Sequence, residues 1–122
     1  RRTPQPRHGL GSYFGRGAAL WDDPQLVRDD DGAAALAEAL GHGAAIVMRG
    51  NGAVVVADSL LKAVVLTWYL EDAARLELAV LAAGLKAQSL VLSDAEVQRR
   101  ATGAGLIFER MWDYLVAGDP EL

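Results

Sequence analysis

The sequence has no cysteine and only two histidines, His8 and His42, among its 122 residues. Without cysteine the chain can form no disulfide bond, no thiolate ligand for zinc and no thiol nucleophile. This composition is typical of a cytoplasmic protein, and we expect a cytoplasmic location. Two histidines also leave few candidates for imidazole chemistry near neutral pH.

Basic clusters and long apolar runs are missing as well. Twelve Lys and Arg against sixteen Asp and Glu give a formal net charge of −4, and the basic residues form no dense patch. This distribution argues against nucleic acid as a partner. Charged residues such as Lys62, Glu71 and Arg75 interrupt the apolar stretches, so no stretch is long enough to span a bilayer. The first residues lack the apolar segment of a signal peptide. We expect no membrane partner.

Alanine and valine are abundant instead. Hydrophobic residues make up 52% of the chain, and its mean hydropathy is +0.13. The length fits one domain of ordinary size, but this apolar content is high for so small a monomer. We therefore expect part of the apolar surface to be buried against another chain.

The clearest local pattern is a hairpin followed by a long helix. Two β-branched runs, at 44–48 and 53–57, flank the sequence Arg-Gly-Asn-Gly at 49–52, which is a strong hairpin signal. The glycines and asparagine tolerate the positive φ that a tight turn requires. A helix then begins at Asp58 or Ser59 and ends at Gly84. Its apolar residues cover more than one stripe, which predicts burial on two sides.

The N-terminal part is less regular. Residues 1–17 contain prolines and several glycines, and we expect an irregular arm there. Residues 18–21 form a candidate short strand. Carboxylates at 29–31 precede an alanine-rich helix that should end at Gly41.

The C-terminal part begins with a helix start signal. Ser93 and Glu96 have the spacing of a capping box, which predicts the start of a last helix. Gly103 and Gly105 weaken the middle of that helix, so a break or kink is expected there.

The hairpin and helix together resemble the class II aldolase/adducin family. That family typically has an apolar strand, Arg, a small or amide residue, His-Gly, a valine-rich strand and a helix containing Leu-Glu-x-Ala-Ala-Arg. The matching residues here are 48–52, 54–56 and 70–75, and the resemblance extends over about residues 21–84. It implies an α/β fold: half of a three-layer α/β/α domain, with the hairpin packed on long helices. Residues 18–122 would be the C-terminal part, and the N-terminal half would be absent from this chain.

The resemblance implies a metal-dependent C–C bond lyase. Its substrate would be a small hydroxylated acid or carbonyl compound, and we favour decarboxylation of a hydroxylated aromatic or heteroaromatic acid over aldol cleavage. A divalent cation, Zn, Mn or Fe, would be held mostly by ligands outside this chain. The chain would form a homo-oligomer, a tetramer by resemblance, or a complex with a polypeptide that supplies the N-terminal half. The alternative is a non-catalytic adducin-like or regulatory subunit that has lost the metal site.

The role of Asn51 bears directly on the choice between these two functions. It stands where the family has its third metal-binding histidine, after a His-x-His pair that this chain lacks. Asn51 is then a weak metal ligand or a substrate contact, or the site is inactive, or the third ligand comes from elsewhere. A purely structural interpretation is that Asn51 only tolerates left-handed geometry in the turn.

Four other residues are candidates for the site, each with a structural alternative. Arg49 ends a buried strand and suits a substrate carboxylate, or else forms an ion pair. Tyr13 and His8 are candidate substrate contacts, whose alternatives are an aromatic anchor and a solvated surface residue. By resemblance, Tyr114 is the candidate catalytic residue that donates a proton or orients a substrate oxygen; otherwise it is an interface aromatic. His42 is more typical of a turn.

Overall fold

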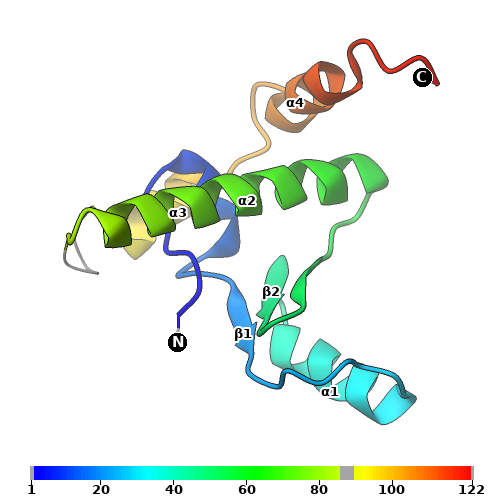
Figure 1. The fold of residues 1–122 in the computed structure, drawn as a ribbon. Helices are drawn as coiled ribbons and strands as arrows, with labels where there is room; N and C mark the ends of the chain where they lie inside the picture. Colours follow the sequence, from blue (N-terminus) through cyan, green and yellow to red (C-terminus); the bar gives the residue numbers. More distant parts are fainter. Residues whose placement is uncertain (1, 86–89, 122) are drawn as a thin grey trace.

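The computed structural model describes residues 2–85 and 90–121 as a mixed α/β fold, in agreement with the prediction. A three-stranded sheet lies between a long helix, α2, and a shorter one, α1 (Figure 1). In chain order the elements are η1 (a 3₁₀ helix, Gly9–Phe14), β1 (Ala19–Trp21), α1 (Asp30–Leu40), β2 (Ala45–Met48), β3 (Gly52–Val55), α2 (Leu60–Ala82), α3 (Asp94–Arg100) and α4 (Ile107–Val116).

The sheet has the order β1-β2-β3 and is mixed. β1 runs parallel to β2, with Ala19 opposite Ile46, and β2 pairs antiparallel with β3. A parallel pair needs a crossover connection, and α1 supplies it. The predicted strand at 18–21 and the predicted hairpin are therefore both confirmed.

The glycines carry the unusual geometry of the hairpin turn. Gly50 has φ 78° and Gly52 has φ 96°, whereas positive φ at non-glycine residues of the described part is confined to Leu90 and Leu106. Asn51 thus does not adopt the left-handed conformation. The purely structural interpretation of this residue is wrong in that respect, because its two glycine neighbours meet the need for positive φ.

Helix α2 is the longest element and begins and ends as predicted. The Ser59 side chain accepts a hydrogen bond from the backbone N–H of Lys62, and Gly84 follows the helix with φ 70°. One side of α2 packs in the core, where Val65 is completely buried. The expectation of burial on two sides is not met within this chain, since Leu60 and Leu78 are 74% and 66% exposed.

The N-terminal segment differs from the predicted irregular arm. Residues Gly9–Phe14 form η1, and Phe14 joins the core cluster beside α2. The His8 side chain caps η1 by accepting a hydrogen bond from the backbone N–H of Gly11. The glycines therefore allow a tight 3₁₀ turn that brings an aromatic side chain into the core, rather than a loose arm.

The predicted last helix is divided in two. The capping box at Ser93 and Glu96 is present and starts α3, which ends at Arg100. α4 begins only at Ile107, after Gly105 at φ 74° and Leu106 at φ 55°. Two consecutive left-handed residues cannot continue a right-handed helix, so the expected break is complete. α4 then packs across α2 (Figure 1).

Within the described part of the chain, none of the helices combines the length and the apolar character needed to cross a membrane.

Candidate functional site at the hairpin turn

Arg49 connects the hairpin turn to the end of β1. Its Nε donates to the Asp22 carboxylate at 2.6 Å, and its Nη2 donates to the Asp22 backbone carbonyl at 2.9 Å. The Arg49 backbone N–H continues the ladder with Trp21. The side chains of Arg49 and Asp22 are 38% and 40% exposed, so the pair lies at the surface. Arg49 therefore has the ion pair that its structural alternative requires, and its substrate role stays a prediction.

Asn51 makes a second connection to the same segment. Its Nδ2 donates to the backbone carbonyl of Pro24 at 3.0 Å. Together Arg49 and Asn51 fasten the turn to residues 22–24, twenty-seven positions earlier in each case. The turn is thus held in a fixed position at one end of the sheet.

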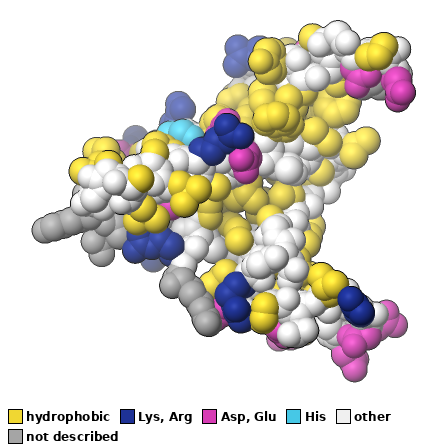
Figure 2. All heavy atoms as spheres, viewed as in Figure 1, with side chains coloured by type: hydrophobic (Ala, Val, Ile, Leu, Met, Phe, Trp, Pro, Cys, Tyr) yellow, Lys and Arg dark blue, Asp and Glu magenta, His cyan; other side chains and the backbone are white. Residues whose placement is uncertain are grey.

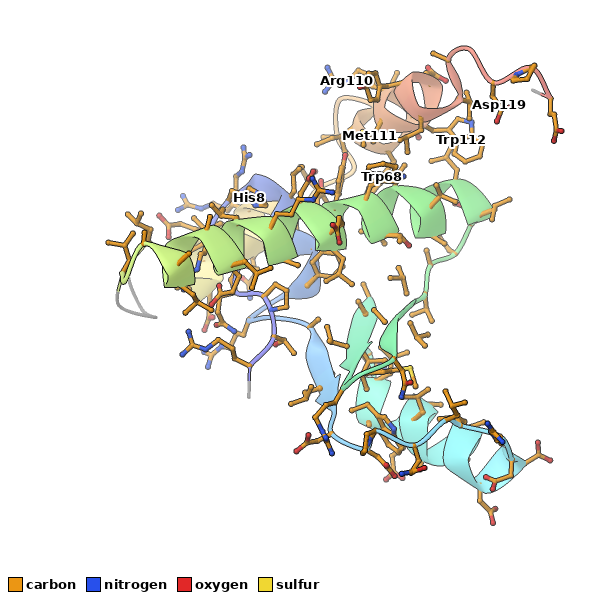
Figure 3. The ribbon with its side chains drawn as sticks, in the orientation of Figure 1. His8, Trp68, Arg110, Met111, Trp112 and Asp119 are labelled. Atoms are coloured by element: carbon orange, nitrogen blue, oxygen red, sulfur yellow. The ribbon has the colours of Figure 1, made fainter. Side chains whose placement is uncertain are left out.

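Tyr13 and His8 lie with η1 rather than at the turn. The Tyr13 hydroxyl donates to the Thr102 carbonyl at 2.6 Å, and its ring packs against Tyr69 and Phe108 with centroid distances of 5.6 and 5.2 Å. Burial raises the pKa of Tyr13, which keeps its phenol protonated at neutral pH. These contacts make Tyr13 an aromatic anchor between η1, α2 and α4. His8 immediately precedes η1 and is labelled in Figure 3.

Tyr114 and Arg49 are far apart in the fold. Tyr114 belongs to α4, which lies across α2 from the sheet, and the side chain is 75% exposed (Figure 1). His42 is exposed in the turn between α1 and β2. The structure thus brings Arg49 and Asn51 together at the turn, places His8 and Tyr13 at η1, and places Tyr114 on the other side of α2.

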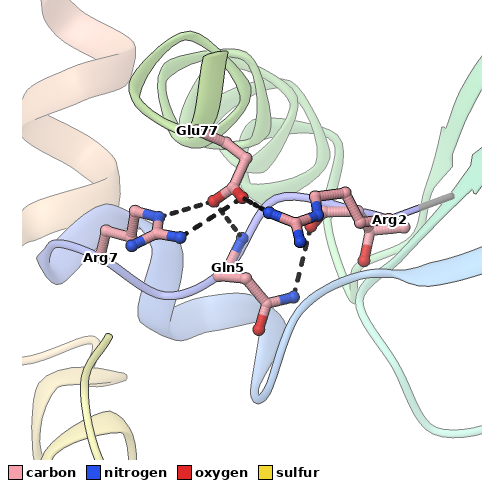
Figure 4. A network of polar contacts seen from close by, with 5 residues as sticks. Arg2, Gln5, Arg7 and Glu77 are labelled. Atoms are coloured by element: carbon pink, nitrogen blue, oxygen red, sulfur yellow. Dashed lines mark hydrogen bonds and ion pairs between the residues drawn. The ribbon is translucent and has the colours of Figure 1, made fainter. Parts of the chain in front are cut away.

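A buried polar network connects the N-terminal segment to α2 (Figure 4). Glu77 accepts a hydrogen bond from Arg7 Nε at 2.7 Å, and their side chains are only 5% and 1% exposed. The backbone N–H of Gln5 and the guanidinium of Arg2 also donate to Glu77. The bond from Arg7 holds the pKa of Glu77 below its usual value. Since every partner of Glu77 stabilises its charged form, this network is structural rather than an acid–base centre.

The described residues do not fit a metal centre of their own. Residues 2–85 and 90–121 contain no group of three or more His, Cys, Asp or Glu side chains arranged to hold a metal ion. At the turn, the candidate ligand is the neutral amide of Asn51, whose Nδ2 donates to Pro24 and whose Oδ1 is the atom that a metal ion would take. An amide oxygen alone is a weak ligand for a transition metal. A metal site at the turn would need ligands beyond those that the described residues bring together.

More than half of the chain matches the model of one known protein family. The model described as the class II aldolase and adducin N-terminal domain matches residues 6–78. The chain belongs to the class II aldolase and adducin family. The match starts at Pro6, upstream of the resemblance noted from the hairpin and helix, and so includes η1 and β1. No curated protein matches the chain.

Several residues at these sites were missed by sequence reasoning. Asp22 and Pro24 hold the turn, and Arg7 and Glu77 form the buried pair. An Asp-Pro sequence after a short strand signals a turn, but nothing in it names a partner twenty-seven residues later. The residues that match the family model include both partners of each contact, but the match does not indicate that these residues touch.

Proposed function

We propose that this chain is part of a lyase that breaks a C–C bond in a small hydroxylated acid or carbonyl compound. The variant we favour is decarboxylation of a hydroxylated aromatic or heteroaromatic acid. The fixed hairpin turn carries the proposal: it lies within the residues that match the family, and it presents a guanidinium and an amide side by side.

Arg49 is proposed to bind the substrate carboxylate. A guanidinium has five donors in a rigid plane, so a group that contacts Asp22 on one edge still has donors for a second carboxylate. Asp22 holds Nε and Nη2 and thereby fixes the orientation of that plane. Asn51, beside it in the turn, is proposed to contact the substrate through its amide.

Tyr114 is proposed to act from a second copy of the chain. Within one chain α2 separates it from the turn, so the two can share a site only across an interface. The exposed area supports such an interface. The chain exposes 7985 Å², whereas a compact monomer of its 13.0 kDa would expose roughly 6,300 Å². This excess of exposed area is larger than the roughly 800 Å² that each partner buries in a protein–protein interface of standard size.

In the proposed reaction the bond to the substrate carboxylate breaks and CO₂ leaves. The electron pair stays on the substrate carbon, which then takes a proton. We propose Tyr114 of the second copy as the donor of that proton, through its phenol hydroxyl. The divalent cation that the family resemblance implies would take its ligands from outside this chain, and we assign no step to it.

The natural full-length protein, supplied with Mn²⁺ or Zn²⁺, tests the proposal. We expect it to release CO₂ from one or more hydroxylated aromatic or heteroaromatic acids. Arg49→Lys should reduce turnover strongly, since lysine loses the two-point contact, while the melting temperature stays nearly unchanged because the ion pair is half-exposed. Loss of stability without a specific loss of turnover would assign Arg49 to structure alone.

The second candidate function is a non-catalytic, adducin-like or regulatory subunit. Two observations favour it. The residue at the turn is a neutral amide, Asn51, whose nitrogen donates to Pro24. The described residues also contain no cluster of metal ligands. Metal analysis of the purified full-length protein separates the two functions. Near-stoichiometric Zn, Mn or Fe supports the lyase, and fully assembled protein without bound metal supports the subunit.

A further inference from the structure

A pocket of about 410 Å³ lies between α2, α4 and η1, on the other side of α2 from the sheet. Its volume is in the range of about 300–1,000 Å³ that is typical of small-molecule sites. Leu10, Ile107 and Met111 give it apolar walls. Figure 2 shows hydrophobic side chains gathered between α4 and α2, and Figure 3 shows Met111 in the space between these helices.

Two tyrosines make the pocket suitable for an aromatic ring. Tyr69 is only 3% exposed, and its hydroxyl donates to the backbone carbonyl of Ile107 at 3.4 Å. The Tyr69 hydroxyl is thus already engaged inside the protein, and only the small exposed part of its ring reaches the pocket. Tyr114, which is 75% exposed, stands at the rim. Aromatic rings stack or pack edge-to-face with a planar ligand at modest but specific energies.

Opposite charges face the pocket from its two helices. Asp72 comes from α2 and Arg110 from α4. Neither side chain forms a hydrogen bond or an ion pair with another residue in the described part of the chain, although both act electrostatically on Tyr69. A guanidinium without a partner beside an apolar pocket is suited to a carboxylate, and a carboxylate without a partner is suited to a hydroxyl or N–H donor.

We propose that this pocket binds a small aromatic acid that carries a hydrogen-bond donor on its ring. The ligand carboxylate pairs with Arg110, its ring packs against Met111 and Tyr114, and its donor reaches Asp72. The inference concerns binding and does not depend on the proposed lyase activity. It uses Tyr114 as a wall of the pocket, within one chain.

The test uses 4-hydroxybenzoate as the probe and the full-length protein. Calorimetry should show saturable binding of one molecule per chain. Benzoate lacks the donor and 4-hydroxybenzyl alcohol lacks the carboxylate, so both should bind more weakly. Arg110→Gln should raise the dissociation constant about tenfold or more, because it removes a charge-assisted hydrogen bond. Arg28→Gln, an equal charge change at an exposed residue before α1, should leave it unchanged.

Asp72→Asn tests the contact with the hydrogen-bond donor of the ligand separately from the contact with its carboxylate. It should weaken binding of 4-hydroxybenzoate but not of benzoate, which has no donor for Asp72. If Arg110→Gln and Arg28→Gln behave alike, or if binding of 4-hydroxybenzoate is not saturable, the proposal is overturned.

The two methionines locate the bound probe. Met111 lines the pocket, whereas Met48 ends β2 beside the hairpin turn. With ¹³C-methyl methionine, we expect the Met111 resonance to shift on titration and the Met48 resonance to stay. A shift of Met48 alone would place the ligand at the turn and reject this pocket, whatever the outcome for the lyase activity.

Discussion

Glu77 and Arg7 form an ion pair of 2.7 Å that is almost completely buried and joins residues seventy positions apart. A buried pair is costly to desolvate, and removing one partner leaves the other charge without compensation. The pair therefore fixes where the N-terminal segment lies on α2 rather than adding much net stability.

Breaking this pair should be severe. Arg7→Met should lower the free energy of unfolding by about 3–5 kcal/mol, because Glu77 is left buried and charged. The double variant Arg7→Met with Glu77→Leu should recover part of that loss. Arg75→Ala breaks the exposed pair with Glu71 and should cost less than about 0.5 kcal/mol. Urea denaturation of the four proteins measures these values, and equal losses for Arg7→Met and Arg75→Ala would contradict the burial of the Glu77 pair.

Glu77 should contribute measurably to the pH dependence of the stability of the folded protein. Its pKa is lowered in the folded protein, chiefly by Arg7, so folding is favoured wherever the carboxylate is charged. This contribution is complete above the pKa of an unfolded glutamate, about 4.3, and is lost as the pH falls through the lower folded value. The difference in melting temperature between wild type and Glu77→Gln should therefore shrink below about pH 4. A difference that grows in acid would contradict this assignment.

The hairpin turn should be more sensitive at Gly52 than at Asn51. Gly52 has φ 96°, and a side chain there is strained although the space around it is open. Gly52→Ala should cost about 1–2 kcal/mol. Asn51→Ala loses one exposed hydrogen bond to Pro24 and should cost less. Thermal melts compare the two, and a larger loss for Asn51→Ala would mean that the bond to Pro24, not the glycine geometry, holds the turn.

Much of the fold follows from local signals in the sequence. The hairpin, the start of α2 at Ser59 and the capping box of Ser93 and Glu96 are all encoded within a few residues, and all three are predicted correctly. The contacts that close η1 are also local, but 3₁₀ turns have a weak sequence pattern, and the prolines and glycines of residues 1–17 predict an irregular arm instead.

The candidate site was harder to predict because its contacts are long-range. The position of Arg49 at a strand end predicts a role for it, but the sequence does not indicate its partner Asp22, since ion pairs between distant residues leave no periodic pattern. The separation of Tyr114 from the turn depends on how α4 crosses α2, and that crossing is set by the break at Gly105 and Leu106. Sequence reasoning expected the break but not the direction of the chain after it.

Association of the chain should depend on the exposed side of α2. Leu78 is 66% exposed there and makes no contribution to the buried core. We expect wild-type protein to be oligomeric at micromolar concentration, and Leu78→Glu to shift it toward monomer with unchanged helix content, because a charge is costly in an interface core. Light scattering and circular dichroism measure both properties. A wild-type protein that is a stable monomer at this concentration would remove the basis for a shared site.

The most direct test of the proposed lyase is complementation between Arg49→Ala and Tyr114→Phe. Each variant alone should release little or no CO₂ from the substrate that wild type decarboxylates. If Arg49 of one copy and Tyr114 of another form one site, oligomers reassembled from an equal mixture contain some sites with both native residues, roughly a quarter of the total for a pairwise site. We expect about this fraction of wild-type activity to return on mixing. A mixture that stays as inactive as its two components would contradict it.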